Sequence, residues 1–126
     1  MRREVIRTSE APQVGIPLSQ AIKLGDLIFT SGVTARDPNT GHFIGVGIEQ
    51  QTEQVILNLK SILEAAGSSL EKVLKVTVFL TDIRDFEGMN KVYKKFFPKD
   101  PPARSTVEVS KLAIDARIEI EMVASV

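Results

Sequence analysis

The sequence predicts an α+β fold: a mixed β-sheet with two helices packed on one of its faces. Two segments, residues 48–66 and 86–96, place apolar side chains at helical spacing, and short runs with period-two alternation lie before, between and after them. The resulting order is β-β-β-α-β-α-β-β. A chain of 126 residues suits one domain, residues 1–126. Because two helices cover only one sheet face, we expect another subunit to cover the second.

The N-terminal third predicts one short strand and a hairpin. Residues 4–7 are expected to form the strand, and an irregular segment with two prolines, residues 9–19, follows it. Residues 20–24 and 27–31 flank Gly25-Asp26, a two-residue connection that accepts positive φ and therefore predicts the hairpin. Residues 37–41 (Asp-Pro-Asn-Thr-Gly) predict a second turn.

Residues 48–66 carry the clearest helical pattern, and Gly67 supplies its C-terminal stop. The next four residues, 68–71 (Ser-Ser-Leu-Glu), match a capping box and predict a brief turn. Residues 73–81 then alternate as a strand. Since Phe79 makes its second face only half polar, both faces are expected to be partly covered. Asp85 is expected to cap the second helix, and Pro98 to end it.

The last two strands each combine an apolar face with an ionic one. In residues 105–109 the apolar face carries Val107 and Val109, and the other face carries Thr106 together with Arg104 just before the run. In residues 118–122 the isoleucines share one face, and the opposite face carries Glu119 and Glu121. If both strands join one sheet, we expect the ionic faces to coincide. A partly buried guanidinium there needs a paired carboxylate or an anionic ligand.

Composition excludes several classes of function. Sixteen basic and sixteen acidic residues give no bulk charge for binding nucleic acid or membranes. The absence of cysteine excludes disulfides and thiol chemistry, and a single histidine, His42, argues against a zinc site. No run approaches the ~20 apolar residues that span a bilayer, and no signal-like segment follows Met1. We therefore expect a soluble, cytoplasmic protein without a metal.

Nearly the whole chain resembles the RidA/YjgF family of small trimeric proteins. The two strongest matches are residues 102–105 (Pro-Ala-Arg-Ser) and 118–121 (Ile-Glu-Ile-Glu). The other matching segments, in chain order, are residues 19–21, 29–32, 37–41, 51–52, 63–67, 75–80 and 85–86. An ordered series at family spacing is specific for the fold and less specific for activity.

The resemblance implies a chorismate-mutase-like homotrimer with a pocket at each subunit interface and neither metal nor cofactor. Deaminase members of the family hydrolyse reactive 2-imino and enamino acids, such as 2-iminobutanoate and 2-iminopropanoate, to 2-keto acids and ammonia. An arginine at the position of Arg104 holds the substrate carboxylate, a role that suits a planar guanidinium. A glutamate at the position of Glu119 orients or activates the attacking water.

The family's remaining pocket positions correspond to Ser31, Gly32, Phe86, Asn90 and Thr106. One further position departs from the pattern. Deaminase members usually carry a tyrosine in a Gly-Pro-Tyr-Ser-Gln stretch, whereas this chain has Leu18 in residues 16–20 (Ile-Pro-Leu-Ser-Gln) and therefore lacks that hydroxyl. The rim segment after Gly32 is Val-Thr-Ala in place of the common Gln-Ile-Pro.

Three alternatives stand beside the deaminase interpretation. Arg104 could be a structural partner of Glu119 or Glu121. The same cleft could bind a 2-keto acid or another small carboxylate without turnover, which the leucine at position 18 favours. Some relatives have been linked to translation inhibition or RNA cleavage, and a basic edge (Lys91, Lys94, Lys95 and Lys99) is the one feature here that suits RNA. Neutral charge and the lack of histidine-based chemistry argue against RNA as a partner.

Overall fold

The computed structural model describes residues 1–126 and contains one six-stranded mixed sheet and two α-helices, which confirms the predicted α+β class. The strands lie in the order β1-β2-β3-β6-β4-β5, with β4 and β5 parallel and every other pair antiparallel. The elements are β1 (Arg3–Ile6), β2 (Ala21–Leu24), β3 (Leu27–Thr30), α1 (Ile48–Ala65), β4 (Val73–Leu80), α2 (Phe86–Phe96), β5 (Ala103–Glu108) and β6 (Ile118–Ser125).

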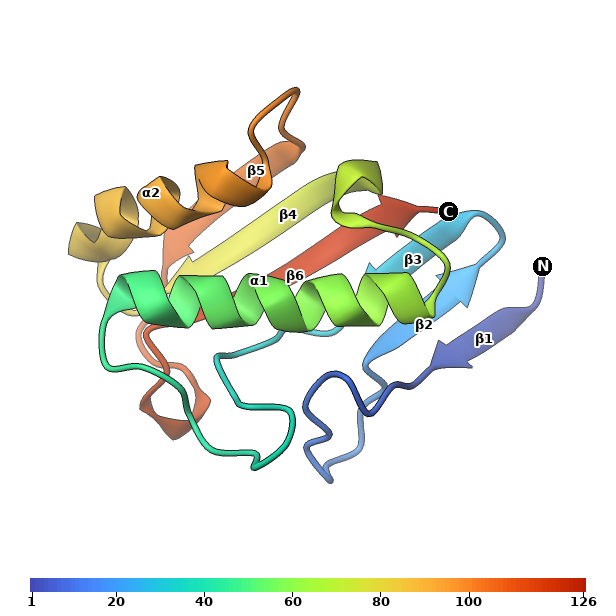
Figure 1. Ribbon diagram of the computed structural model, residues 1–126, viewed down its shortest axis with the longest axis horizontal. Coiled ribbons are helices and arrows are strands. Elements are labelled where there is room, and N and C mark those ends of the chain that lie inside the picture. Colours follow the sequence, from blue (N-terminus) through green and yellow to red (C-terminus); the bar gives the residue numbers. More distant parts are fainter.

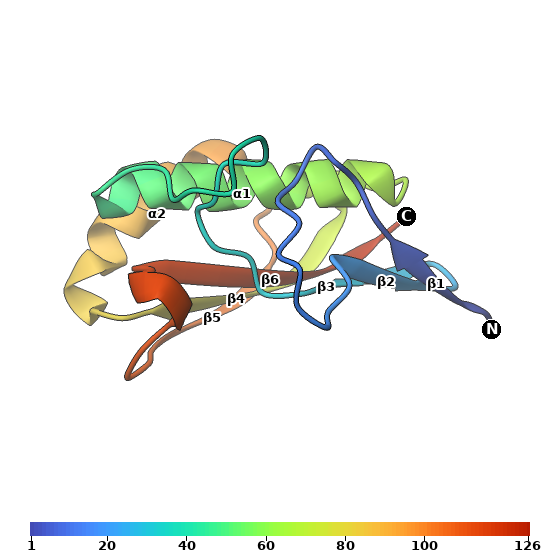
Figure 2. The same cartoon turned by 90° about the horizontal axis from the view of Figure 1, so that it is seen from below.

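Both helices lie on the same face of the sheet, and no helix covers the other face (Figures 1 and 2). The core fills the layer between sheet and helices, and its fully buried side chains include Ile56 and Leu59 of α1, Val76 of β4 and Ile120 of β6. The uncovered face exposes Leu27, Phe29 and Val107 by about two fifths each (39%, 42% and 43%). Neither helix has the length and apolarity needed to cross a membrane.

The predicted turns and helix stop are present. Gly25 adopts φ 59° between β2 and β3, a conformation that favours glycine and lets the hairpin close in two residues. The long helix ends at Ala65, one residue before the expected end. Gly67 follows with φ 84°, which turns the chain away from the helix axis.

Both predicted side-chain caps are wrong. Asp85 makes no capping hydrogen bond at the start of α2, because its carboxylate instead accepts from Arg117 Nη1 at 3.4 Å. The cap moves to Asp82, which accepts from the backbone N–H of Arg84 at 2.9 Å and opens a short 3-10 turn, Ile83–Asp85. Before the turn Leu70–Lys72, no side chain caps, since Ser68 donates its hydroxyl to the carbonyl oxygen of Ser125.

The register of three neighbouring strands overturns the prediction that the ionic faces coincide. Val76 of β4 pairs with Arg104 on one side and with Met122 on the other, so Arg104 points to the face that the helices cover. Phe79 pairs with Val107 and with Glu119, so Glu119 points to the uncovered face. Arg104 and Glu119 therefore lie on opposite faces of one sheet.

Candidate active site in two halves

Arg104 and α2 form the first half of the candidate site. The half-buried Arg104 side chain runs beneath α2, with Cζ 4.6 Å from the ring centroid of Tyr93 and 5.7 Å from that of Phe86. Its Nη1 lies 3.9 Å from the sulfur of Met89. Beside it, a cavity of about 320 Å³ is lined by Asn90, Tyr93, Lys94, Phe97, Pro101, Pro102 and Arg104. The predicted residues Phe86, Asn90 and Arg104 are thus brought to one edge of the molecule.

The guanidinium of Arg104 has no acidic partner in the chain. The ion pairs are Arg84–Asp82, Lys91–Glu49 and Arg117–Asp85, and none involves Arg104. The alternative that Arg104 forms a structural pair with Glu119 or Glu121 is therefore wrong within one chain. Aromatic faces and a thioether hold the cation but accept hydrogen bonds weakly at most, so its N–H donors remain available to an anion.

Two buried hydroxyl groups lie next to this arginine without a hydrogen-bond partner. They are Thr106 Oγ1, two residues further along the same face of β5, and the hydroxyl of Tyr93. Burial raises the pKa of Tyr93, against the opposing effect of the nearby Arg104 charge. Buried polar groups normally find partners, so two unpaired hydroxyls beside one unpaired cation indicate a polar binding surface.

Glu119 forms the second half with the segment that follows β3. Val33 and Ile120 exchange backbone hydrogen bonds of 2.9 and 3.0 Å, which hold this segment beside β6. A Cβ atom at Gly32 would overlap the Glu119 carboxylate, so only a glycine lets the carboxylate lie there. Burial raises the pKa of Glu119, and the negative charge of Glu121 raises it further. A carboxyl group with a raised pKa is better suited to accept a proton near neutral pH.

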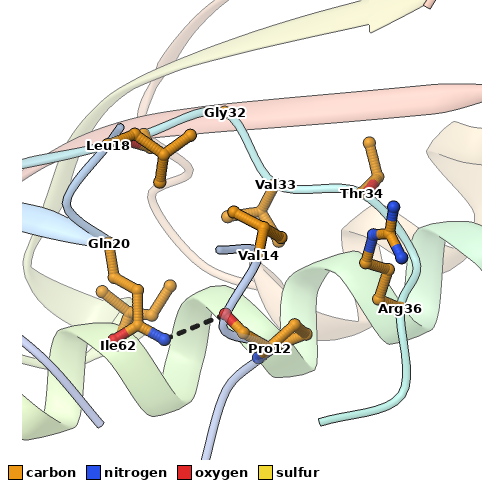
Figure 3. A pocket seen from close by; sticks show the side chains of 10 residues that line it. Pro12, Val14, Leu18, Gln20, Gly32, Val33, Thr34, Arg36 and Ile62 are labelled. Atoms are coloured by element: carbon orange, nitrogen blue, oxygen red, sulfur yellow. Dashed lines mark hydrogen bonds between the residues drawn. The ribbon is translucent and has the colours of Figure 1, made fainter. Parts of the chain in front are cut away.

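Leu18 belongs to this second half, on a loop that a buried glutamine holds in place (Figure 3). Gln20 accepts from the backbone N–H of Thr8 at 2.7 Å and donates to the carbonyl oxygen of Pro12 at 3.0 Å. Ser31 donates its hydroxyl to the carbonyl oxygen of Ser19 at 2.6 Å. Leu18 itself is 46% exposed. A cavity of about 50 Å³ is lined by Pro12, Val14, Leu18, Gln20, Ser31, Gly32, Val33, Thr34, Arg36 and Ile62.

The structure thus collects the predicted residues into two groups that do not meet. One group is Arg104, Thr106, Phe86 and Asn90, and the other is Glu119, Gly32, Ser31 and Leu18. The helical pattern of residues 86–96 predicts only an apolar face, whereas two residues of that face, Met89 and Tyr93, contact Arg104. Their spacing of three and seven residues from Phe86 was the available signal, because it places all three on one helix face. No group of three or more His, Cys, Asp or Glu side chains is arranged to hold a metal.

Relatives of this chain carry names of two kinds. The family model described as Endoribonuclease L-PSP matches residues 8–126. Reactive Intermediate Deaminase A, chloroplastic, of Arabidopsis thaliana is 45% identical over 99% of this chain and 67% of its own length. The human 2-iminobutanoate/2-iminopropanoate deaminase is 40% identical over 97% of this chain and 89% of its own length.

Solved structures match the fold over nearly its whole length. Escherichia coli TdcF with bound serine superposes with a TM-score of 0.93 at 38% identity, covering 98% of both chains. The Escherichia coli YjgF gene product gives a TM-score of 0.92 at 39% identity, covering 97% of this chain and 98% of its own. Fold and sequence thus define a small α+β protein of the Rid deaminase-like class. The chain belongs to the Endoribonuclease L-PSP family, which is the RidA/YjgF family.

Proposed function

We propose that this protein hydrolyses reactive 2-imino and enamino acids to 2-keto acids and ammonia, in a cleft between two subunits of a homotrimer. The observation that carries the proposal is the unpaired guanidinium of Arg104, held by aromatic and thioether groups beside an open cavity. A substrate carboxylate would supply the missing anion through two parallel hydrogen bonds. TdcF, a relative with a bound amino acid, is consistent with such a ligand.

The two halves of the site support a role for a second subunit. Arg104 and Glu119 lie on opposite sheet faces, so a substrate held by one cannot reach the other across the sheet of the same chain. The uncovered face that carries Glu119 also exposes Phe29 and Val107. Apolar surface of this kind favours association with another copy, and cyclic symmetry would then build the same composite cleft at every interface.

The chemistry needs few groups because an imine carbon is already electrophilic. Arg104 binds the carboxylate and orients the carbon, while the Glu119 carboxylate accepts a proton from a water as its oxygen bonds to that carbon. Glu119 passes that proton to the imine nitrogen, which gives a carbinolamine with a hydroxyl and an amino group. The carboxylate then accepts the hydroxyl proton and delivers it to the nitrogen as the C=O bond forms and the C–N bond breaks, so that ammonia and the 2-keto acid are released and the carboxylate is regenerated. Water is the only co-reactant, and no oxidation or reduction occurs.

The first experiment measures keto-acid formation from 2-imino acids that an amino-acid oxidase generates in the assay. We expect acceleration by the native protein, loss of substrate affinity in Arg104→Ala, and loss of turnover with retained binding in Glu119→Gln. The affinity loss should be ~1.5–3 kcal/mol, the range for hydrogen bonds to charged groups. Full activity in both variants would exclude the assigned roles.

A mixture of the two variants separates a composite site from a site within one chain. Suppose that Arg104 and Glu119 of one site come from different subunits. When equal amounts of Arg104→Ala and Glu119→Gln chains are refolded together, about one quarter of the sites should then contain both native residues, because each residue is native in half of the chains and the chains assemble at random. Activity of the mixture equal to the average of the two variants alone would contradict the composite cleft. Light scattering at micromolar concentration checks the trimer.

A second candidate function is binding of a small carboxylate without turnover. It is favoured by Leu18, because an exposed aliphatic side chain stands where the family's deaminases usually carry a hydroxyl. Retention of 2-oxobutanoate by the native protein, combined with no acceleration of imine hydrolysis, would select this function.

The family description also names an endoribonuclease. The basic edge is the feature that suits it, although Lys91 is paired with Glu49 at 3.3 Å. RNA retention that weakens steeply with salt would support this third candidate, and its absence at low salt would remove it.

A further inference from the structure

We infer that Tyr93 is a positioning residue, whose ring sets the place of the Arg104 guanidinium before substrate binds. The kinetic consequence of this inference rests on the proposed function, whereas the contact between Tyr93 and Arg104 lies within one chain and does not depend on it. Arg104 Cζ lies 4.6 Å from the Tyr93 ring centroid, within the distance at which an arginine is attracted to an aromatic face. No carboxylate of the chain forms an ion pair with this cation.

The Tyr93 ring is itself fixed by its neighbours. It is only 6% exposed, and its centroid lies 4.7 Å from that of Phe97 with the ring planes tilted by 36°. Phe86, the other ring near Arg104, is 38% exposed and 5.7 Å from Cζ. Tyr93 is therefore the closer and the better anchored of the two aromatic contacts, and we assign the positioning role to it.

The ring, and not the hydroxyl, carries this role. The Tyr93 hydroxyl is buried and forms no hydrogen bond of ordinary distance and angle within the chain, so the defined contact with Arg104 is made by the ring. A phenylalanine keeps the aromatic face that attracts the cation, whereas a leucine keeps a smaller apolar side chain and loses the face. The pair Tyr93→Phe and Tyr93→Leu therefore separates cation–π positioning from core packing.

The kinetic test compares these two variants with Val92→Ala. Val92 is a buried neighbour on α2 that makes neither a hydrogen bond nor a ring contact with Arg104. Positioning without chemistry predicts a KM for 2-imino acid raised roughly 5- to 30-fold in Tyr93→Leu, with kcat within about twofold of native. Val92→Ala should keep the native KM, and the KM of Tyr93→Phe should rise less than that of Tyr93→Leu. An unchanged KM in Tyr93→Leu, or an equal rise in Tyr93→Phe, overturns the inference.

A second readout needs no activity and no variant of Tyr93. A cation over an aromatic face lies in the shielding region of the ring, so the Arg104 side-chain N–H signal of the native protein should be shifted upfield in the NMR spectrum. Its assignment is confirmed by its disappearance in Arg104→Lys. A signal at the position of a freely solvated arginine in the native protein would overturn the inference even if Tyr93→Leu failed to fold. If the shift is present but no imine or keto acid is bound, the proposed function fails and the positioning of Arg104 stands.

Discussion

The Glu119 carboxylate packs against the α-carbon of Gly32, and this contact leaves no room for a side chain at position 32. A Cβ atom added there would lie 2.8 Å from the carboxyl carbon of Glu119. Because Val33, the next residue, exchanges backbone hydrogen bonds with Ile120, neither segment can move aside without breaking them. The position of the carboxylate is thus set by the smallness of residue 32.

Gly32→Ala is expected to displace the Glu119 carboxylate and leave the fold intact, since Gly32 does not adopt a positive φ. A misplacement of a catalytic group by about 1 Å can lower turnover roughly 100-fold. The rate of keto-acid formation and the melting temperature should be compared with Gly47→Ala, whose added Cβ would meet nothing within 4 Å. Native kcat in Gly32→Ala would show that the carboxylate position does not matter.

If the proposed deaminase activity is present, Glu121→Gln is expected to raise the rate of keto-acid formation at acidic pH. The pKa of Glu119 is raised first by burial and second by the Glu121 charge, so removing that charge lowers the pKa and keeps Glu119 ionised at lower pH. In the pH dependence of kcat/KM, the acidic limb should therefore move to lower pH. An unmoved limb would mean that Glu119 is not the group whose ionisation controls the rate.

Glu119→Gln is expected to be more stable than the native protein at neutral pH. A carboxyl group whose pKa is higher in the folded than in the unfolded state binds its proton more tightly when folded, so its ionisation reduces stability as the pH rises through that interval. Below the unfolded pKa this penalty is absent, and the advantage of the amide should vanish. Chemical denaturation at neutral and at acidic pH measures the difference. Equal differences at both pH values would contradict the linkage.

Leu18→Tyr tests what the family departure means. The exposed side chain at this position lines the Gly32 half of the site, and the loop that carries it is held by Gln20 and by the Ser31 hydroxyl rather than by Leu18. The substitution should therefore leave the melting temperature unchanged and raise turnover if only the ring hydroxyl is missing. No gain in turnover would indicate a pocket adapted to another ligand.

Ile114→Asn should stabilise the fold by about 1 kcal/mol. Ile114 lies in a short 3-10 turn, Ala113–Asp115, with φ 55°, a left-handed conformation that is strained for a β-branched residue and tolerated by asparagine. It is 47% exposed, so little apolar burial is lost. The free energy of unfolding should be measured at one protein concentration. Val46→Asn is the control, at an 88% exposed position without positive φ, and should change stability little.

The elements of this fold follow closely from the sequence, because each depends on local periodicity. Helix α1 ends one residue from its expected end, and Gly25 and Gly67 take the conformations that their positions predict. The capping interactions were less predictable. Aspartate is a residue type that often caps helices, yet the Asp85 carboxylate accepts a hydrogen bond from Arg117, which is distant in sequence, and not from the backbone of the helix. The residue type therefore indicates that a side chain can cap a helix, but contacts with distant residues determine whether it does.

The face on which Arg104 lies could not be predicted from alternation alone. Alternation separates Arg104 from Val107 but does not say which face the helices cover. On most strands the apolar face is the covered one, and this rule holds for β6. On the edge strand β5 it is reversed: Val107 is 43% exposed on the open face, while Arg104 is accepted beneath α2 by Tyr93, Phe86 and Met89. On β5, the aromatic rings and the thioether around the Arg104 guanidinium take the place of the apolar side chains that a covered strand face usually carries.

The buried amide of Gln20 has a consequence for how the specificity of such a protein can diverge. One side chain, bonded to the backbone at Thr8, Ala11 and Pro12, anchors the first part of the preceding loop. The side chains further along that loop, among them Ile16 at 60% exposure and Leu18, add little to the core. Substitutions there change the rim of the site at almost no cost in folding. The loop is therefore the part of the molecule where a new substrate preference can arise by single mutations, while the arginine and the glutamate stay in place.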